Sequence, residues 1–161
     1  MQKTTEVQTG TGVPQLADVV EQGDIYSSLR AMEELRKIGE PAVGPLVEKL
    51  VMADGEGRWR FAMALARVGN PAVDPLIETA RSGGEGIRNP AVWALAEIGD
   101  KKAVGPLIDI IREEGSMCCR VLTAAALIKL GDPAGIDEVY HQYEQHGEEY
   151  LSMVMEAYEG S

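Results

Sequence analysis

Cysteine, aromatic side chains and positive charge are all scarce in this chain of 161 residues. The two cysteines, Cys118 and Cys119, are adjacent, so no spaced set of thiols exists for a disulfide framework or a zinc site. This predicts a cytoplasmic protein. Aromatic residues make up 5% of the chain and hydrophobic residues 45%. Ala, Val, Leu and Ile must therefore form the core, which favours closely packed helices over a sheet sandwich.

Lysine and arginine together number 15, against 26 acidic residues, which gives a formal net charge of -11. Phosphate binding needs clustered basic residues, so this balance argues against nucleic acid and against an anionic membrane surface. It permits a basic protein partner. No run approaches the ~18 apolar residues of a membrane-spanning helix. Residues 1–13 contain no apolar stretch either, so we expect a disordered tail rather than a signal peptide.

One sequence motif recurs about every thirty residues. It consists of an aliphatic residue followed by glycine and, a few residues later, proline followed by leucine. Its copies begin at Ile38-Gly39, Val68-Gly69, Ile98-Gly99 and Leu130-Gly131, the third with one extra residue and the fourth degenerate. A fixed period of this length is typical of stacked units, each of which buries its apolar face against its neighbours. The sequence thus predicts an all-α, right-handed superhelix of about four helix pairs with a half-repeat at each end.

The first helix of each pair, helix A, precedes the glycine. Aligning the glycines places equivalent apolar residues in columns, such as Leu35, Leu65, Leu95 and Leu127. Within each segment the apolar positions fall on one stripe of an amphipathic helix. A column of Ala64, Ala94 and Ala126 would let neighbouring helices approach closely. We therefore expect these columns to form the core.

The turn between the two helices is predicted by the glycines and by the residues after them. Glycine tolerates the left-handed conformation found just past a helix end. Asn70, Asp100 and Asp132 are turn and cap formers. Helix B then begins either at Pro45, Pro75 and Pro106 or one turn earlier, near Pro41 and Pro71.

The periodicity divides the chain into a tail and one repeat domain. The tail is 1–13 and the domain is 14–161. We expect repeats at approximately 25–55, 56–84, 85–115 and 116–146, with caps at 14–23 and 147–159.

The third repeat carries Arg88, Ala94-Leu95, Ile98-Gly99-Asp100, Ala103-Val104 and Pro106-Leu107-Ile108. This pattern resembles the short HEAT repeat of phycocyanobilin-lyase-like (E-Z type) proteins. The resemblance covers roughly 14–146 and implies the α-solenoid fold. It implies no single activity, because this repeat serves scaffolds, lyase-like proteins and a metal-dependent hydroxylase.

Arg58, Arg88 and Arg120 stand at equivalent positions at the start of helix A, where the first repeat has Ser28. They could form a basic ladder for a carboxylate or phosphate ligand. The interpretation we favour is structural, with each arginine bound to a turn acid or carbonyl of an adjoining repeat.

Catalytic chemistry finds little support in the sequence. The related hydroxylase uses repeated His-Glu pairs, whereas His141 and His146 precede Gln and Gly and lie on different faces of a helix. Cys118 and Cys119 have no adjacent base to activate them, so we interpret them as packing residues. We expect no metal, no cofactor and no catalytic residue.

Acidic residues follow each helix-B proline at the same spacing: Glu48, Glu78 and Asp109. Stacking would bring them into one column on the face that resembles the concave lining of the family's solenoid. Arg81 and Arg112 come three residues later, and Tyr140 takes the acid's place in the fourth repeat. The column could form a groove for a basic segment. Alternatively it is a solvated face, balanced by Glu78–Arg81 and Asp109–Arg112 pairs.

We therefore expect a non-catalytic scaffold module that binds another protein through its helix-B face, at Glu48, Glu78, Asp109, Arg81, Arg112 and Tyr140. The resemblance also leaves open a tetrapyrrole (bilin) lyase-like or cofactor-handling protein. A third hypothesis is a structural piece of a larger assembly.

Overall fold

The computed structural model describes residues 12–160, and within this range the chain is helical, with no strand. The α-helices are α1 (Val13–Gln22), α2 (Ile25–Ile38), α3 (Glu40–Met52), α4 (Gly55–Val68), α5 (Val73–Ser82), α6 (Glu85–Ile98), α7 (Val104–Glu113), α8 (Met117–Leu130) and α9 (Pro133–Glu159). Two 3₁₀ turns, η1 (Asn70–Ala72) and η2 (Lys101–Ala103), lead into α5 and α7. The predicted all-α fold is confirmed. Of the predicted tail, residues 1–11 lie outside the described residues, and Val13 already belongs to α1.

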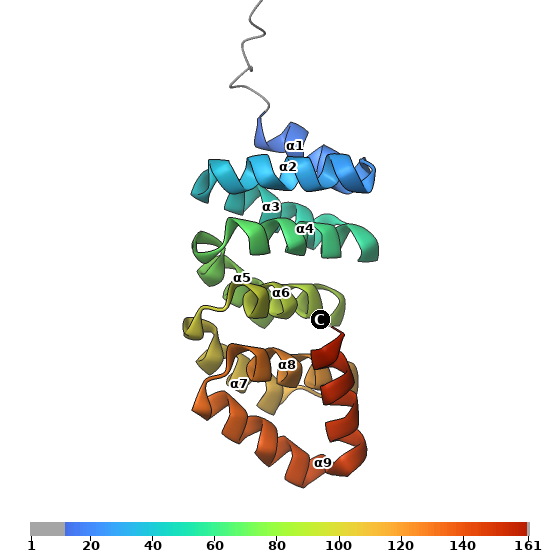
Figure 1. Cartoon of the computed structure of the whole chain (residues 1–161), viewed down its shortest axis with the longest axis vertical. Helices are drawn as coiled ribbons and strands as arrows, with labels where there is room; N and C mark the ends of the chain where they lie inside the picture. Colours follow the sequence, from blue (N-terminus) through green and yellow to red (C-terminus); the bar gives the residue numbers. More distant parts are fainter. Residues whose placement is uncertain (1–11, 161) are drawn as a thin grey trace, which may run out of the picture.

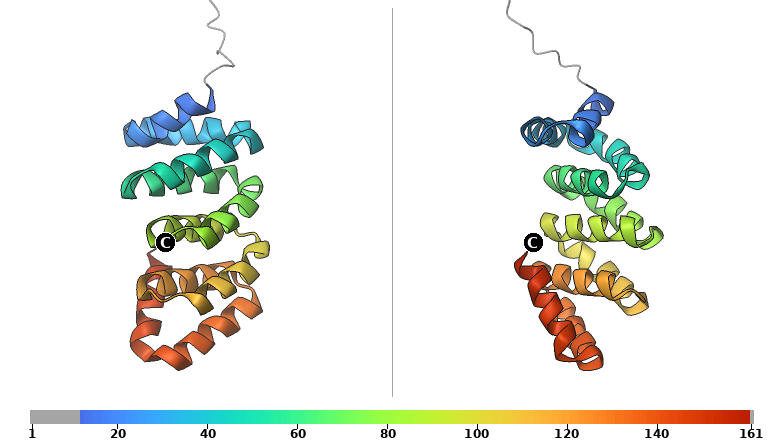
Figure 2. Two further views of the ribbon diagram at one scale, coloured as in Figure 1. Left: turned by 180° about the vertical axis from the view of Figure 1, so that it is seen from behind. Right: turned by 90° about the vertical axis from the view of Figure 1, so that its right-hand side faces the viewer.

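The helices stack in two layers (Figure 1). The helix-A layer contains α2, α4, α6 and α8, each packed on the next, and the helix-B layer contains α1, α3, α5 and α7. Figure 2 shows the helix-B layer from behind and the two layers from the side. Equivalent positions of successive repeats therefore lie on neighbouring helices, as the period predicts. No helix in the described part of the chain combines the length and apolarity that crossing a membrane requires.

The predicted columns form the core between the layers. Leu35, Leu65 and Leu127 are fully buried and Leu95 is 1% exposed. The alanine column is buried beside them, which lets consecutive A helices approach closely. Burial of a leucine side chain contributes about 1.5–3 kcal/mol, so a column that recurs in every repeat stabilises the whole stack.

The turns after helix A use glycine at positive φ in all four repeats, but in two ways. Gly99 (φ 78°, ψ 12°) and Gly131 (φ 69°, ψ 13°) are left-handed as predicted, and an extended aspartate follows each. Asp100 and Asp132 each accept a hydrogen bond from a backbone N–H of the next turn. Gly39 (φ 75°, ψ −135°) instead connects α2 directly to α3, and Gly69 resembles it.

Helix B begins before its recurring proline in each of the first three repeats, by more than one turn in α3 and by two residues in α5 and α7, which follow the 3₁₀ turns. Pro45 lies inside α3, and Pro75 and Pro106 are the third residues of α5 and α7. The first turn of each is tight, as in the 2.9 Å bond from Ala42 N to the Gly39 carbonyl. The alternative placed near Pro41 and Pro71 is therefore correct for α3, whereas in the second repeat Pro71 lies in η1 and α5 begins at Val73. Asn70 does not cap its helix, because its side-chain amide donates to Asp100 instead.

The last helix changes direction at Gly147, where the backbone adopts φ 82° and ψ −172°. The part before Gly147 is helix B of the fourth repeat, because it packs on α7 and α8. The part after it turns back along the helix-A side of the stack, past α8 and toward α6 (Figures 1 and 2). We call residues 148–159 the return helix.

Candidate functional site

The predicted acidic column lies on the exposed side of the helix-B layer. Glu48 projects from α3, Glu78 from α5 and Asp109 from α7, and all three residues are exposed. Their helices are consecutive members of one layer. Asp18 of α1 stands at the same position one repeat earlier, with its carboxylate 3.3 Å from Lys49 Nζ. The column is therefore one residue longer than the repeated motif indicates.

The ion pairs on this face connect repeats. Arg81 Nη2 lies 3.6 Å from Asp109 Oδ2 of the next helix B, and Arg112 Nη2 lies 2.8 Å from Glu138 Oε2 of α9. The predicted pairs within a helix, Glu78–Arg81 and Asp109–Arg112, are wrong. Packed helix axes are only about 8–10 Å apart, so a long arginine side chain reaches the neighbouring helix.

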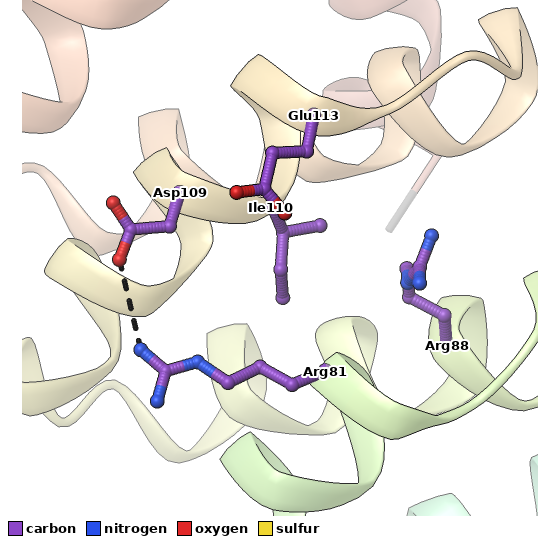
Figure 3. Close-up of a pocket in the computed structure, with 5 residues that line it drawn as sticks. All are labelled: Arg81, Arg88, Asp109, Ile110 and Glu113. Carbon is purple, nitrogen blue, oxygen red and sulfur yellow. Dashed lines mark ion pairs between the residues drawn. The ribbon is translucent and has the colours of Figure 1, made fainter.

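A hollow of about 400 Å³ opens beside the Arg81–Asp109 pair. It is lined by Arg81 of α5, Arg88 of α6, and Asp109, Ile110 and Glu113 of α7. Figure 3 shows Arg81 and Asp109 joined along one side and Arg88 on the opposite side. Two predicted site residues thus meet in one depression. Its lining presents both signs of charge around an almost buried isoleucine.

Arg88 is held at this hollow by the end of the preceding repeat and by Glu114 of its own repeat. Its guanidinium donates to the carbonyls of Ala80 (2.9 Å) and Gly83 (3.0 Å), and its Nη1 lies 2.5 Å from Glu114 Oε2. Burial alone would raise the pKa of Glu114, but hydrogen bonds from the Ser116 N–H and from Arg88 lower it. Arg120 donates to the Glu114 carbonyl. The structural interpretation is therefore confirmed for Arg88 and Arg120.

Arg58 and the first repeat use a variation of this arrangement. The Arg58 guanidinium lies over Gly86 of the next repeat, where a Cβ would stand 2.8 Å from its Nη1. In the first repeat, Ser28 Oγ donates to the Val19 carbonyl at 3.1 Å and lies near those of Val20 and Gly23. Ser28 therefore binds carbonyls at the end of α1, as Arg88 binds carbonyls at the end of α5.

Glu138 is a site residue that the sequence analysis missed. It occupies the position that Leu46, Leu76 and Leu107 fill in the earlier repeats, and it is 4% exposed. Its carboxylate accepts from Arg112 Nε and from Gln142 Nε2, both at 3.0 Å. The hydrogen bond to Glu138 raises the pKa of Arg112. The sequence did contain a signal for this site, because an acidic residue stands at a position that is leucine in the other three repeats.

Tyr140 is 60% exposed on α9, and its ring packs at 5.9 Å against Tyr143. The structure describes no contact between Tyr140 and the hollow. Arg112 binds Glu138 of α9. The predicted residues therefore fall into a group at α5 and α7 and a group at α7 and α9.

No three His, Cys, Asp or Glu side chains in the described part of the chain are placed to hold a metal ion. Cys118 is exposed, and Cys119 is buried. Burial, with the nearby charges of Glu114 and Glu85, raises the pKa of Cys119 to about 12. A buried, protonated thiol is a poor nucleophile, in agreement with its interpretation as a packing residue.

Comparisons with known proteins agree with this architecture. The family model of HEAT repeats matches residues 43–128. A solved structure, the complex of CpcE and CpcF of phycocyanin lyase from Nostoc sp. PCC7120, contains a chain that superposes with a TM-score of 0.62 at 19% identity. The superposition covers 90% of this chain and 96% of that chain. No curated protein matches the sequence. The chain therefore belongs to the HEAT-repeat family, which confirms the predicted repeat, and its fold resembles that of a phycocyanin-lyase chain.

Proposed function

Because the chain belongs to the HEAT-repeat family, we propose that it is a non-catalytic module that binds another protein across its helix-B face. We define this face by Glu48, Glu78, Arg81, Asp109, Arg112 and Glu113. The carrying observation is the hollow between α5 and α7, which is open, lined by charges of both signs and bordered by the acidic column. A depression of this kind suits the side chains of a partner segment more than a buried small molecule, which prefers an apolar pocket.

Two of the acids have charges available to a partner. Glu48 and Glu78 form no ion pair among the described residues, whereas Asp109 is already balanced by Arg81. A basic segment that crosses α3 and α5 would place its Lys or Arg side chains at these two carboxylates. Such pairs contribute mainly to specificity and to the association rate, and they weaken as salt rises. The proposed ligand is therefore a basic segment of a protein.

The test begins with a pull-down from an extract of the source cell, followed by identification of the partner by mass spectrometry. The purified partner is then titrated by calorimetry against the native chain and against a variant with Glu48→Lys, Glu78→Lys and Asp109→Lys. We expect the variant to bind at least about tenfold more weakly, because each reversal replaces attraction by repulsion. Equal affinity of the two proteins would mean that the partner binds elsewhere.

A matched control separates this face from overall charge. Glu40→Lys, Glu144→Lys and Glu159→Lys change the net charge by the same amount at exposed positions away from the hollow. This control should keep the native affinity at 0.15 M salt, where charges more than about 8 Å apart are screened. Equal weakening in both variants would indicate unspecific attraction to an acidic protein.

Likeness to the phycocyanin-lyase structure supports a second candidate, a bilin lyase-like or cofactor-handling protein. Incubation with a free bilin, followed by absorption spectroscopy, tests it. A shifted visible band would support this function, and an unchanged spectrum would remove its main support. For either function we propose a cytoplasmic location, which the two free thiols support.

A further inference from the structure

The return helix shows what kind of segment the helix-A layer accepts. Tyr150 and Val154 of this helix are buried against the stack. Ala157 closes a small cleft whose other walls come from α6 and α8: Trp93, Ala96, Glu97, Leu122, Ala125, Ala126 and Lys129. The outer side of α6 and α8 is thus a docking surface for one helix, and the chain itself supplies that helix.

The return helix is amphipathic and acidic. Its polar positions include Glu148, Glu149, Glu156 and Glu159, and the whole of α9 contains no lysine or arginine. The surface on which it lies presents Lys129, whose ammonium group pairs with Glu97. The observed docking therefore rests on the apolar stripe of the return helix, and Lys129, paired with Glu97, stands at the border of the surface.

The same layer continues past the return helix onto α4 and α2, where it is uncovered within the described residues. Trp93 marks the border, and its ring meets that of Trp59 edge to face at 6.1 Å. Trp59 is 39% exposed and Met63 is 38% exposed. Leu29 and Met63 occupy the equivalent positions one repeat earlier: Leu29 corresponds to Trp59, and Met63 corresponds to Trp93. An apolar stripe thus runs on without interruption from the occupied part of the layer.

Basic residues border this uncovered stripe. Lys37 and Arg67 occupy the positions that Glu97 and Lys129 hold in the occupied part. Taken together, α2 and α4 reverse the balance of the acidic chain, since they carry Arg30, Arg36, Lys37, Arg58, Arg60 and Arg67 against Glu33, Glu34 and Glu56. The pKa of Glu33 is lowered, first by its hydrogen bond from Arg36 and further by the charges of Lys37 and Arg67. At the border itself Lys37 pairs with Glu34 at 3.0 Å, whereas Arg67 forms no ion pair among the described residues, so the border keeps a net positive charge.

We propose that the outer face of α2 and α4 binds an acidic amphipathic helix of a partner protein, laid on Leu29, Trp59 and Met63 with its carboxylates toward Lys37 and Arg67. The chain's own acidic helix is already seated on α6 and α8, so the occupant comes from a different molecule. Helix-in-groove docking of this kind relies on apolar anchors at helical spacing, which the return helix displays. This surface lies on the opposite layer from the helix-B face, so the two proposals stand or fall separately.

The probe for the test is a fluorescein-labelled synthetic peptide with the sequence of residues 147–160, titrated with the full-length chain and followed by fluorescence anisotropy. We expect saturable binding that weakens at least about tenfold in the variant Lys37→Glu with Arg67→Glu, because two attractive charges become repulsive. Met63→Glu should weaken it similarly by placing a charge in the apolar stripe. The matched control, Lys101→Glu with Lys102→Glu, makes the same charge change at the exposed turn before α7 and should bind as the native chain does.

Several outcomes would overturn the proposal. Equal loss in the control variant would mean unspecific attraction, and no loss in the Lys37 and Arg67 variant would mean binding elsewhere. Loss with Lys129→Glu alone would mean that the peptide exchanges with the return helix. Dimers of the native chain that Met63→Glu dissociates, seen by sedimentation, would assign the face to a second copy. If the double variant does not fold, the indole N–H signals of the native chain decide: a peptide-induced shift of Trp59 supports the proposal, and a shift of Trp93 alone contradicts it.

Discussion

Arg60 on α4 binds the carbonyl of Gly23, and the two residues belong to different repeats. Its Nη1 donates to that carbonyl at 2.9 Å and to the Val20 carbonyl at 3.2 Å, and it lies 3.3 Å from Ser28 Oγ. Gly23 and Val20 are the equivalents of Gly83 and Ala80, the two carbonyls that Arg88 binds. The end of α1 is thus satisfied from the following repeat, because Ser28 is too short to replace an arginine alone.

Removing this arginine should destabilise the N-terminal end of the stack. We expect Arg60→Ala to lower the free energy of unfolding by about 1–3 kcal/mol, because carbonyls at the end of α1 lose a charged donor. The loss is measured by urea denaturation followed by circular dichroism. Arg36→Ala is the control, since Arg36 pairs with Glu33 of its own helix near the surface, and it should cost less than Arg60→Ala does. Equal losses would show that the contacts with α1 contribute nothing.

Replacement of Gly39 and of Gly44 by alanine should change the stability of the protein in opposite directions. Gly39 has φ 75° and ψ −135°, a conformation that alanine avoids, so Gly39→Ala should destabilise by about 1–3 kcal/mol. Gly44 lies inside α3 with no atom within 4 Å of the added Cβ, so Gly44→Ala should stabilise by about 0.4–1 kcal/mol. Midpoints of thermal unfolding would rank the two variants and the native chain. The reverse order would contradict the described turn.

The buried carboxylate of Glu138 should depend on Arg112. Arg112→Leu leaves the buried carboxylate of Glu138 without its cation, and we expect the free energy of unfolding to fall. Adding Glu138→Leu restores the residue type of this column in the other repeats and should recover most of the loss. Urea denaturation of the two single variants and the double variant forms a complete cycle. Additive losses would mean that the two side chains do not interact.

The adjacent thiols should react at very different rates. Cys118 is exposed, whereas Cys119 is fully buried with a pKa raised to about 12, so its reactive thiolate is almost absent at pH 8. Alkylation with iodoacetamide and peptide mass spectrometry should find label on Cys118 first. Because the pKa of Cys119 is higher in the folded chain than the ordinary 9.0, its contribution to stability is complete below pH 9 and is lost as the pH rises toward 12. Equal labelling at pH 8 would contradict the buried placement.

The periodic sequence predicts the features that recur in every repeat and misses the features that differ between repeats. The leucine column, the helix order and the structural role of Arg88 can be read from alignment of one repeat with the next, because stacked units place equivalent residues together. The ion pairs cannot be predicted in this way. Arg81 could reach either Glu78 or Asp109, and the distance between the packed helices determines which of the two it binds. Glu138 shows the remaining difficulty: the fourth repeat departs from the pattern there, and the departure becomes informative only when Arg112 is seen beside it.

The reversal at Gly147 also bears on the order in which the molecule comes apart. A stack of repeats in which each unit touches only its neighbours can open from either end. The return helix, however, packs on α8, and its Ala157 lines a cleft with α6, so opening of the fourth repeat also breaks contacts with the third, while α1 and α2 are held from one side, by α3 and α4. Amide hydrogen exchange should therefore be fastest at the amino-terminal pair and slowest where the returning helix clamps the stack.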